Sequence, residues 1–322
     1  MGLKSRKKKI AFVGAGYMSN EHIKVFLHLK KRFLVTGIFN RTRSKANQLS
    51  KKYKIPYVAN SIEDLYKKTS ADVVLISVSE TKVYEILSKA FQYPWKIMVE
   101  KPAGYNYKNA NKIFSLAKNK KRLKDILVAL NRRNYPTTLQ VLENIKSIKS
   151  KRIINIHDQQ NIFDPKIKKK PFLVRNNLMY CNSIHLIDYL NILCRGRIVK
   201  IKNILKSKKN KTGIILSYLK YSSGDIGIYK CVWNMPSPWS VSVTTNARSL
   251  ELKPLEKLSV RSKFSKIKKI IKTINKEPKM LKPGLTNQAI ELHKFLINKK
   301  NNLVSLKESL DTMRIIKKIY GI

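Results

Sequence analysis

The sequence predicts an α/β Rossmann nucleotide-binding domain followed by an α+β domain with a large open, mainly antiparallel sheet. Three observations predict this. A glycine turn, Gly14-Ala15-Gly16, follows an apolar strand; strand-like and helix-like segments then alternate; and beyond residue 130 strand-like segments follow one another. Strands that alternate with helices form parallel sheets, whereas successive strands form antiparallel ones. We therefore expect domains at residues 1–130 and 131–322.

The first domain is predicted from short apolar runs separated by amphipathic segments. A buried parallel strand is apolar throughout, whereas a surface helix repeats apolar residues every three to four positions. Ser61 and the acidic residues after it resemble the capping box that begins a helix. Strands are predicted at residues 10–13, 34–39, 72–78, 96–99 and 126–130, and helices at about 18–29, 44–54, from 61, 81–91 and 107–118.

The second domain is predicted from five longer segments that are apolar or alternate in polarity. This pattern is typical of strands in an antiparallel sheet. Helices are expected before and after the sheet, over residues 136–148 and about 306–320. The strands are predicted at residues 152–157, 198–205, 213–221, 226–233 and 239–245.

Residues 262–282 carry apolar side chains at helical spacing amid eight lysines. The apolar positions are Phe264, Ile267, Ile271 and Ile274. This spacing predicts a helix that packs on the second sheet and turns its lysines to solvent. The alternative is a basic amphipathic helix that binds a membrane surface.

The formal net charge of +49, from 68 basic and 19 acidic residues, raises the question of a polyanionic partner. Charge of this sign suggests nucleic acid or an acidic membrane surface. However, the lysines are spread along the whole chain, whereas a nucleic-acid binder concentrates them on one face or tail. We therefore keep a nucleic-acid binder only as the less favoured alternative and expect no specific nucleic-acid partner.

Cysteine content and hydropathy predict a cytoplasmic protein without a membrane span. The three cysteines form no CxxC pair, so neither a disulfide framework nor a metal site is expected. No apolar run approaches the ~20 residues of a membrane-spanning helix. The basic stretch before residue 10 resembles the start of a signal peptide, but a buried first strand explains the following apolar residues better.

The glycine turn has the form GxGxxS. In such turns the first glycine permits the tight bend, and the second lets the backbone approach a pyrophosphate at the helix N-terminus. Here the turn lies between a predicted strand and a predicted helix, which is the context that dinucleotide binding requires. Ser19 is a small substitute for the third glycine. The turn therefore predicts a dinucleotide site.

The end of the second strand bears on the choice between NAD and NADP. NAD sites usually place a carboxylate there to bind the ribose 2′-hydroxyl. This chain has Asn40 and Arg41 instead. Arg41 would attract a 2′-phosphate and could stack on adenine, so NADP is favoured over NAD. The alternative is that Arg41 is a solvated side chain in a lysine-rich protein.

Taken together, the motifs resemble those of the glucose–fructose oxidoreductase / inositol dehydrogenase family (Gfo/Idh/MocA), nearly end to end. The most specific is Glu100-Lys101-Pro102, which lies between the glycine turn and a His-Leu-Ile-Asp string that begins at His185. The family's final helix tends to pack back on the nucleotide domain, so residues 306–320 are expected to do so here.

The resemblance implies roles for several residues. Lys101 would touch the nicotinamide ribose and a substrate hydroxyl, and would stabilise the alkoxide as hydride leaves carbon. His185 would be the general base. Pro102 is expected in a rigid turn, with a cis peptide bond as one form. The cofactor-binding residues are expected to be Gly14, Ala15, Gly16, Tyr17, Met18, Asn40, Arg41, Ser77, Val78, Glu100 and Lys101.

The chain departs from the family at the substrate site. Many members carry Asp four residues before the histidine, where this chain has Cys181, a poor proton acceptor. Asn182 could supply a hydrogen bond instead. The surroundings of Asn182 and the segment 131–135 resemble members linked to surface-polysaccharide or amino-sugar synthesis. Arg133 and Tyr135 would then face an anionic or hydroxylated substrate.

We therefore expect an NAD(P)-dependent oxidoreductase that acts on a sugar, cyclitol or sugar nucleotide, with no metal. The substrate would lie between the first domain and the second sheet, and the sheet would also support a homo-oligomer. The main alternative is a cofactor-binding family member with little dehydrogenase activity, because Cys181 replaces the usual aspartate.

Overall fold

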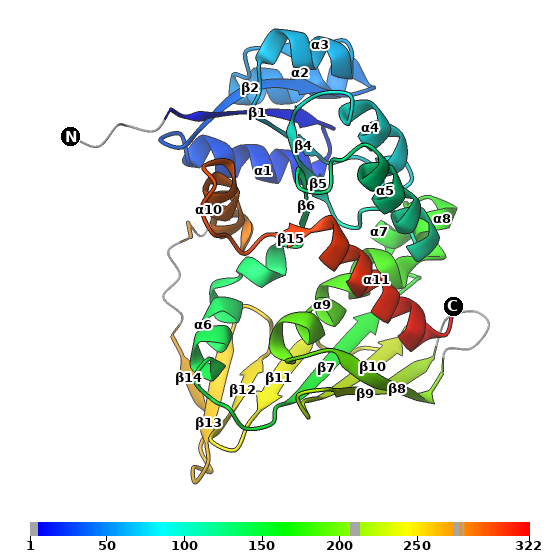
Figure 1. Ribbon diagram of the computed structural model, residues 1–322, viewed down its shortest axis with the longest axis vertical. Coiled ribbons are helices and arrows are strands. Elements are labelled where there is room, and N and C mark those ends of the chain that lie inside the picture. The colour runs from blue at the N-terminus through cyan, green and yellow to red at the C-terminus, as the bar shows by residue number, and fades with distance from the viewer. Residues whose placement is uncertain (1–5, 207–212, 273–276, 279) are drawn as a thin grey trace. The chain divides into compact units, whose positions relative to one another are not determined.

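The computed structural model describes residues 6–206, 213–272, 277–278 and 280–322. Contacts group them into two compact units, each with one sheet (Figure 1). Neither unit is one continuous stretch of the chain, because a C-terminal segment belongs to unit 1. Unit 1 comprises the described residues of Met1–Gly104, Lys108–Asn131 and Glu277–Leu310; unit 2 comprises those of Tyr105–Tyr107, Arg132–Lys276 and Asp311–Ile322.

Unit 1 contains a seven-stranded sheet in the order β15-β6-β5-β4-β1-β2-β3. Strands β1 to β6 pair in parallel, and β15 is antiparallel to β6. The parallel part is the doubly wound Rossmann order, which binds dinucleotides beside its first strand, where the order reverses. The strands are β1 (Lys8–Val13), β2 (Phe33–Phe39), β3 (Val58–Ala59), β4 (Val73–Ile76), β5 (Lys96–Glu100), β6 (Ile126–Ala129) and β15 (Val304–Ser305).

The helices of unit 1 follow the strands closely, as the alternating pattern predicts. Ser61 caps α3, because its side chain accepts a hydrogen bond from the Asp64 backbone N–H at 2.9 Å. This cap confirms the start that the sequence predicts there. The helices are α1 (Tyr17–His28), α2 (Arg43–Tyr53), α3 (Ile62–Thr69), α4 (Val83–Ala90), α5 (Tyr107–Asn119, whose first residue is grouped with unit 2) and α10 (Leu285–Leu296).

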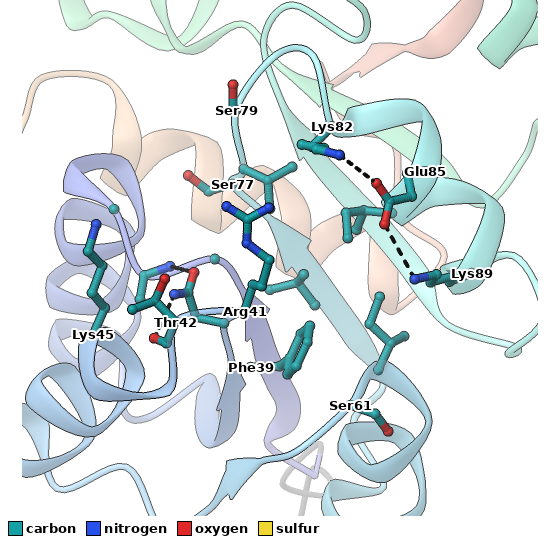
Figure 2. A pocket seen from close by; sticks show the side chains of 18 of the residues that line it. Phe39, Arg41, Thr42, Lys45, Ser61, Ser77, Ser79, Lys82, Glu85 and Lys89 are labelled. Carbon is teal, nitrogen blue, oxygen red and sulfur yellow. Dashed lines mark hydrogen bonds and ion pairs between the residues drawn. The ribbon is translucent and has the colours of Figure 1, made fainter. Parts of the chain in front are cut away.

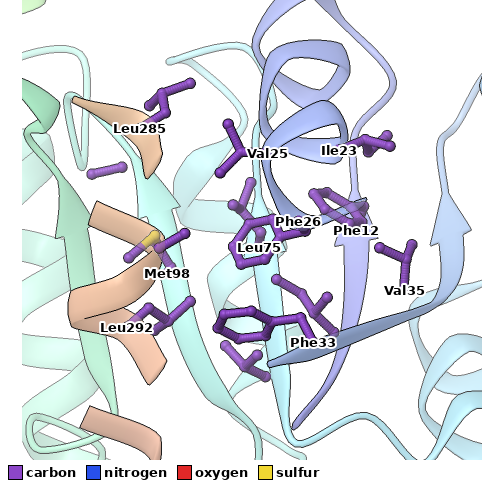
Figure 3. Packing of buried hydrophobic residues seen from close by; sticks show 14 of the residues in the cluster. Phe12, Ile23, Val25, Phe26, Phe33, Val35, Leu75, Met98, Leu285 and Leu292 are labelled. Atoms are coloured by element: carbon purple, nitrogen blue, oxygen red, sulfur yellow. The ribbon is translucent and has the colours of Figure 1, made fainter. Parts of the chain in front are cut away.

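Helix α10, which the sequence pattern did not reveal, completes the core of unit 1. Its buried residues Leu285 and Leu292 join a cluster with Phe26 of α1 and Met98 of β5. Figure 3 shows these side chains facing one another. Burying each leucine contributes roughly 1.5–3 kcal/mol, which holds this distant segment on the nucleotide-binding sheet.

Unit 2 contains an eight-stranded sheet in the order β14-β13-β12-β11-β7-β10-β9-β8. Its pairs are antiparallel except β10 with β7, so the predicted mainly antiparallel sheet is confirmed. The strands are β7 (Ile153–Gln160), β8 (Ile198–Leu205), β9 (Ile214–Tyr221), β10 (Ile226–Trp233), β11 (Ser240–Thr244), β12 (Arg248–Leu252), β13 (Leu258–Ser262) and β14 (Lys269–Ile271).

Short helices and one long helix accompany this sheet. The long helix α11 (Leu306–Tyr320) begins in unit 1, and its residues from Asp311 belong to unit 2. The others are η1 (Asn131–Asn134, whose first residue belongs to unit 1), α6 (Pro136–Ile145), α7 (Pro165–Lys168), α8 (Phe172–Arg175), η2 (Met179–Ser183) and α9 (Ile184–Leu193).

The helix predicted over residues 262–282 is wrong in the described part of that segment. The chain there forms the end of β13, a turn and β14. Pairing with β12 satisfies the backbone of β13, and the adjacent β-branched residues Ile270 and Ile271 favour a strand over a helix. Ile274, which the helical pattern included, lies outside the described residues.

Candidate active site

The glycine turn after β1 uses its two glycines for different reasons. Gly14 has φ +109°, and a Cβ there would lie 2.0 Å from the Ser77 carbonyl oxygen, so the fold itself requires glycine. Gly16 begins α1 as its N-cap, and a Cβ there would meet nothing within 4 Å. Packing therefore does not require glycine at residue 16, whereas a pyrophosphate that approaches the backbone does.

A cavity of about 710 Å³ opens at the carboxyl ends of β1, β2 and β4 (Figure 2). Its size is that of a small-molecule or cofactor site. It extends from the glycine turn to α3 and α4, beside the point where the strand order reverses. Seven of the predicted cofactor-binding residues line it: Gly14, Ala15, Gly16, Asn40, Arg41, Ser77 and Val78.

Asn40 fixes the turn at the end of β2. Its side-chain oxygen accepts a hydrogen bond from the Ala15 backbone N–H at 3.2 Å, and its amide nitrogen donates to the Thr42 carbonyl at 2.8 Å. Asn40 thus ties the glycine turn to the next strand while it lines the cavity. An amide here places no negative charge where a carboxylate would repel a 2′-phosphate.

Some of the basic side chains that line the cavity form ion pairs with an acidic residue, and others do not. Glu85 binds Lys82 at 3.1 Å and Lys89 at 3.4 Å, and the hydrogen bond with Lys82 is the largest cause that lowers the Glu85 pKa. Among the residues that the structure describes, Arg41 and Lys45 have no carboxylate partner. The charged lining residues are Arg41, Lys45, Lys82, Lys89, Glu63 and Glu85.

Tyr17 and Met18 lie at the start of α1, outside the lining of this cavity. Tyr17 is 68% exposed, and the Lys282 ammonium stands 5.1 Å from the centre of its ring. The same ammonium lies 3.6 Å from the Met18 sulfur. Lys282 precedes α10, so this segment adds a basic group beside the glycine turn that sequence reasoning missed.

Glu100 and Lys101 lie at the end of β5, also outside the cavity lining. The buried Glu100 carboxylate binds the His22 Nε2 atom of α1 at 2.7 Å, and its second oxygen accepts from the Lys101 backbone N–H at 3.2 Å. The bond between Lys101 and Pro102 is cis, one of the forms expected. Glu100 therefore fixes the backbone that carries Lys101.

In unit 2, Cys181, Asn182 and His185 lie within two consecutive helical turns. Cys181 and Asn182 belong to η2, a π-helical turn, and His185 is in the first turn of α9. Cys181 is 5% exposed and His185 is 6% exposed. π-Helical turns occur frequently at functional sites, because they shift side chains out of the regular helical register.

A buried hydrogen-bond network supports η2, and sequence reasoning missed it. Asn182 donates to Gln160 at 2.9 Å, and Gln160 donates to Asp158 at 2.8 Å and to Ser183 at 2.9 Å. Tyr229 donates to Asp158 at 2.7 Å. Burial raises the pKa of Asp158, although these hydrogen bonds oppose that shift. The network fixes Asn182 from the sheet side, and its β7 members lie beyond the strand predicted over residues 152–157.

Arg133 and Asp188 form a buried two-point ion pair. The Arg133 Nε and Nη2 atoms lie 2.6 and 2.8 Å from the two Asp188 oxygens. Thr312 of α11 donates to the same carboxylate at 3.0 Å. Tyr135 is also buried, as the N-cap of α6. Direct contact of Arg133 and Tyr135 with a substrate stays a prediction.

The described residues contain no cluster of three or more His, Cys, Asp or Glu side chains suited to a metal ion. Within the same residues, no helix has both the length and the apolar composition needed to cross a membrane.

The strand order, glycine turn and cavity define unit 1 as a dinucleotide-binding domain. Residues 8–126 match the model of an oxidoreductase family with an NAD-binding Rossmann fold, GFO_IDH_MocA. The nucleotide-binding unit therefore matches the Gfo/Idh/MocA family that the sequence motifs predict.

Curated relatives and solved structures provide two further comparisons. The uncharacterized oxidoreductase YhhX of Escherichia coli is 23% identical over 62% of this chain and 57% of its own. UDP-N-acetylglucosamine 3-dehydrogenase GnnA of Acidithiobacillus ferrooxidans has a TM-score of 0.78 at 10% identity and covers 98% of this chain and 97% of its own. Levoglucosan dehydrogenase in complex with NADH has a TM-score of 0.78 at 13% identity, with 98% and 96% covered.

The curated relatives and the solved structures differ in how much of each protein the comparison covers. The alignments with curated relatives span 57% and 41% of the lengths of those proteins. The solved structures cover nearly the whole chain, and at these identities they are similar in fold. The second unit thus shares the fold of its neighbours, while its chemistry rests on its own residues.

Proposed function

We propose that this protein is an NAD(P)-dependent oxidoreductase that interconverts a hydroxyl and a keto group on a sugar, cyclitol or sugar nucleotide. The observation that carries the proposal is the cavity at the glycine turn, where Gly16 leaves open the space that a pyrophosphate would fill. The names of two structural neighbours, a UDP-N-acetylglucosamine 3-dehydrogenase and a levoglucosan dehydrogenase, favour a sugar-like substrate.

The residues fit the cofactor as follows. The backbone at Gly14 and Gly16 and the start of α1 would hold the pyrophosphate, and Arg41 with Lys45 would hold the adenosine end. A bound nicotinamide would supply the acceptor or donor of the hydride. In the oxidation direction, His185 would take the proton of the substrate hydroxyl, and the Lys101 ammonium would stabilise the negative charge that develops on that oxygen.

The rest of the site would set the substrate class. Asn182, fixed by Gln160, would donate or accept a hydrogen bond at a sugar hydroxyl. Cys181 would stand beside it where many family members have aspartate. A role in surface-polysaccharide or amino-sugar synthesis, a cytoplasmic location and a homo-oligomer formed through the unit 2 sheet belong to the same proposal.

The test combines cofactor binding with turnover. We expect NADPH or NADH to bind to the full-length protein in a fluorescence titration. A panel of sugars, cyclitols and sugar nucleotides should contain a compound that changes the nicotinamide absorbance in the presence of enzyme. Failure of both cofactors to bind would overturn the proposal.

A second candidate function is a cofactor-binding protein with little dehydrogenase activity, which the buried Cys181 favours. In that case NADPH would bind, no compound of the panel would be turned over, and Cys181→Asp would restore turnover. Activity of the wild type with any panel compound would exclude this candidate.

Arg41→Ala is expected to weaken NADPH binding about 10- to 100-fold, since it removes a cation that can hydrogen-bond a phosphate. The affinity for NADH, which lacks the 2′-phosphate, should fall no more than about twofold. Titrations with both cofactors measure this change. Arg43→Ala is the matched control, because Arg43 binds Asn60 and does not line the cavity. An unchanged dissociation constant for NADPH in Arg41→Ala would refute the role of Arg41.

A further inference from the structure

The hairpin of β13 and β14 forms one edge of the unit 2 sheet, with β14 as the outermost strand (Figure 1). We call residues 258–272 the edge hairpin. Its turn is ordered by hydrogen bonds. The Ser265 hydroxyl accepts from the Ile267 backbone N–H and donates to the Ile267 carbonyl, both at 3.1 Å. The Lys263 backbone N–H donates to the Ala247 carbonyl at 3.0 Å.

Three large apolar side chains of the edge hairpin face solvent. Phe264 is 91% exposed, Ile267 is 70% exposed and Ile270 is 79% exposed. The register pairs Ile270 with Ser259, on the face opposite to the fully buried Leu258. None of the three therefore contributes to the core of unit 2. Apolar groups gathered in this way on a surface mark a site of association.

Exposed basic residues alternate with these apolar residues along the edge hairpin. Residues 261–272 include six basic residues and no acidic one. Lys268 binds Glu251 of the neighbouring strand β12. The Lys263 ammonium stands 5.1 Å from the centre of the Phe264 ring. All six are exposed: Arg261, Lys263, Lys266, Lys268, Lys269 and Lys272.

We propose that the edge hairpin docks this protein on an anionic lipid membrane. Phe264, Ile267 and Ile270 enter the interface between headgroups and acyl chains, and the surrounding lysines and arginine bind the phosphate-bearing headgroups. A cluster of four to eight basic residues is the number that anionic lipid surfaces attract. This mode of binding needs no membrane-spanning helix and does not depend on the proposed oxidoreductase chemistry.

The charge and the kind of apolar residue favour a membrane over two other partners. The edge hairpin of a second copy would carry the same six exposed basic residues, so two edge hairpins repel each other. A single-stranded nucleic acid would bind through aromatic side chains on which bases stack. Two of the three exposed apolar residues are isoleucines, which insert into lipid but offer no ring for stacking.

The test is cosedimentation of the full-length protein with vesicles. We expect binding to vesicles of phosphatidylcholine mixed with phosphatidylglycerol, and at least about tenfold weaker binding to phosphatidylcholine alone. Replacing the three apolar residues by serine should weaken binding to the anionic vesicles at least about tenfold. Charge reversal should weaken binding at least about fivefold for each lysine, because it removes a cation and adds an anion. The variants are the triple Phe264→Ser, Ile267→Ser, Ile270→Ser and the triple Lys263→Glu, Lys266→Glu, Lys269→Glu.

Matched controls lie on β8, at the opposite edge of the same sheet. Serine at its exposed residues Val199, Ile204 and Leu205 should leave vesicle binding unchanged. The proposal fails if wild type binds anionic vesicles no better than neutral ones, or if the β8 and hairpin variants lose binding equally. It also fails if the protein binds single-stranded DNA through Phe264 while the serine triple leaves vesicle binding unchanged, or if the serine triple only abolishes a dimer seen by light scattering.

Discussion

His185→Ala is expected to lower kcat for a turned-over substrate by a factor of about 10²–10⁴, because it removes the general base. The dissociation constant of NADPH should stay within about twofold, since His185 lies in unit 2 and the dinucleotide cavity is lined by unit 1 residues. Lys101→Met should reduce kcat to a similar extent by removing the charge that stabilises the alkoxide. If His185 and Lys101 act on the same reacting hydroxyl, their effects are not independent. The reduction in kcat of the double variant should then be smaller than the product of the two single fold-reductions.

The exposed His28 at the end of α1 provides the control, and His28→Ala should keep full activity. Added imidazole should restore part of the activity of His185→Ala, which a merely structural histidine would not allow. A kcat within about threefold of wild type in His185→Ala, with cofactor bound, would refute the role of the general base.

The sequence predicts unit 1 well, because its signals are local. A fully apolar run such as Val73–Ile76 forms a parallel strand wherever both faces are covered. Ser61 begins a helix through a contact only three residues along the chain. Gly14 can be identified because the turn that it forms, with φ +109°, lies between adjacent elements, although its close approach to the Ser77 carbonyl cannot be predicted from the sequence.

Contacts between residues that are far apart in the sequence cannot be predicted from the sequence pattern. The sequence pattern did not reveal α10, and only the structure shows that this helix packs against α1. Similarly, Gln160 lies beyond the strand predicted over residues 152–157, although it joins Asn182 to a buried aspartate.

The sequence pattern failed to predict the edge hairpin for a different reason. Phe264, Ile267 and Ile271 recur at intervals of three and four residues, as in an amphipathic helix. In the structure Phe264 lies in a turn, and pairing between strands replaces the helical hydrogen bonds. A spacing of three or four across a turn cannot be distinguished from one turn of a helix by periodicity alone.

The second large effect is expected from the buried ion pair. Arg133→Met should destabilise unit 2 by about 3–5 kcal/mol, because it leaves the Asp188 carboxylate buried without its cation. The two side chains are only 11% and 4% exposed, and the remaining hydrogen bond from Thr312 does not neutralise the charge. The double variant Arg133→Met, Asp188→Leu should recover most of this loss, since no charge stays buried. Urea unfolding of each variant measures the difference.

Lys146→Met is the matched control in the same unit, because it breaks a pair with Glu143 in which both side chains are 75% exposed. An exposed pair contributes at most about 1 kcal/mol. The comparison also separates two roles for Arg133. If Arg133 chiefly holds Asp188 and the start of α6 in place, stability falls and the double variant restores it. If it chiefly binds an anionic substrate, Arg133→Met unfolds like the control while KM rises, and the double variant restores nothing.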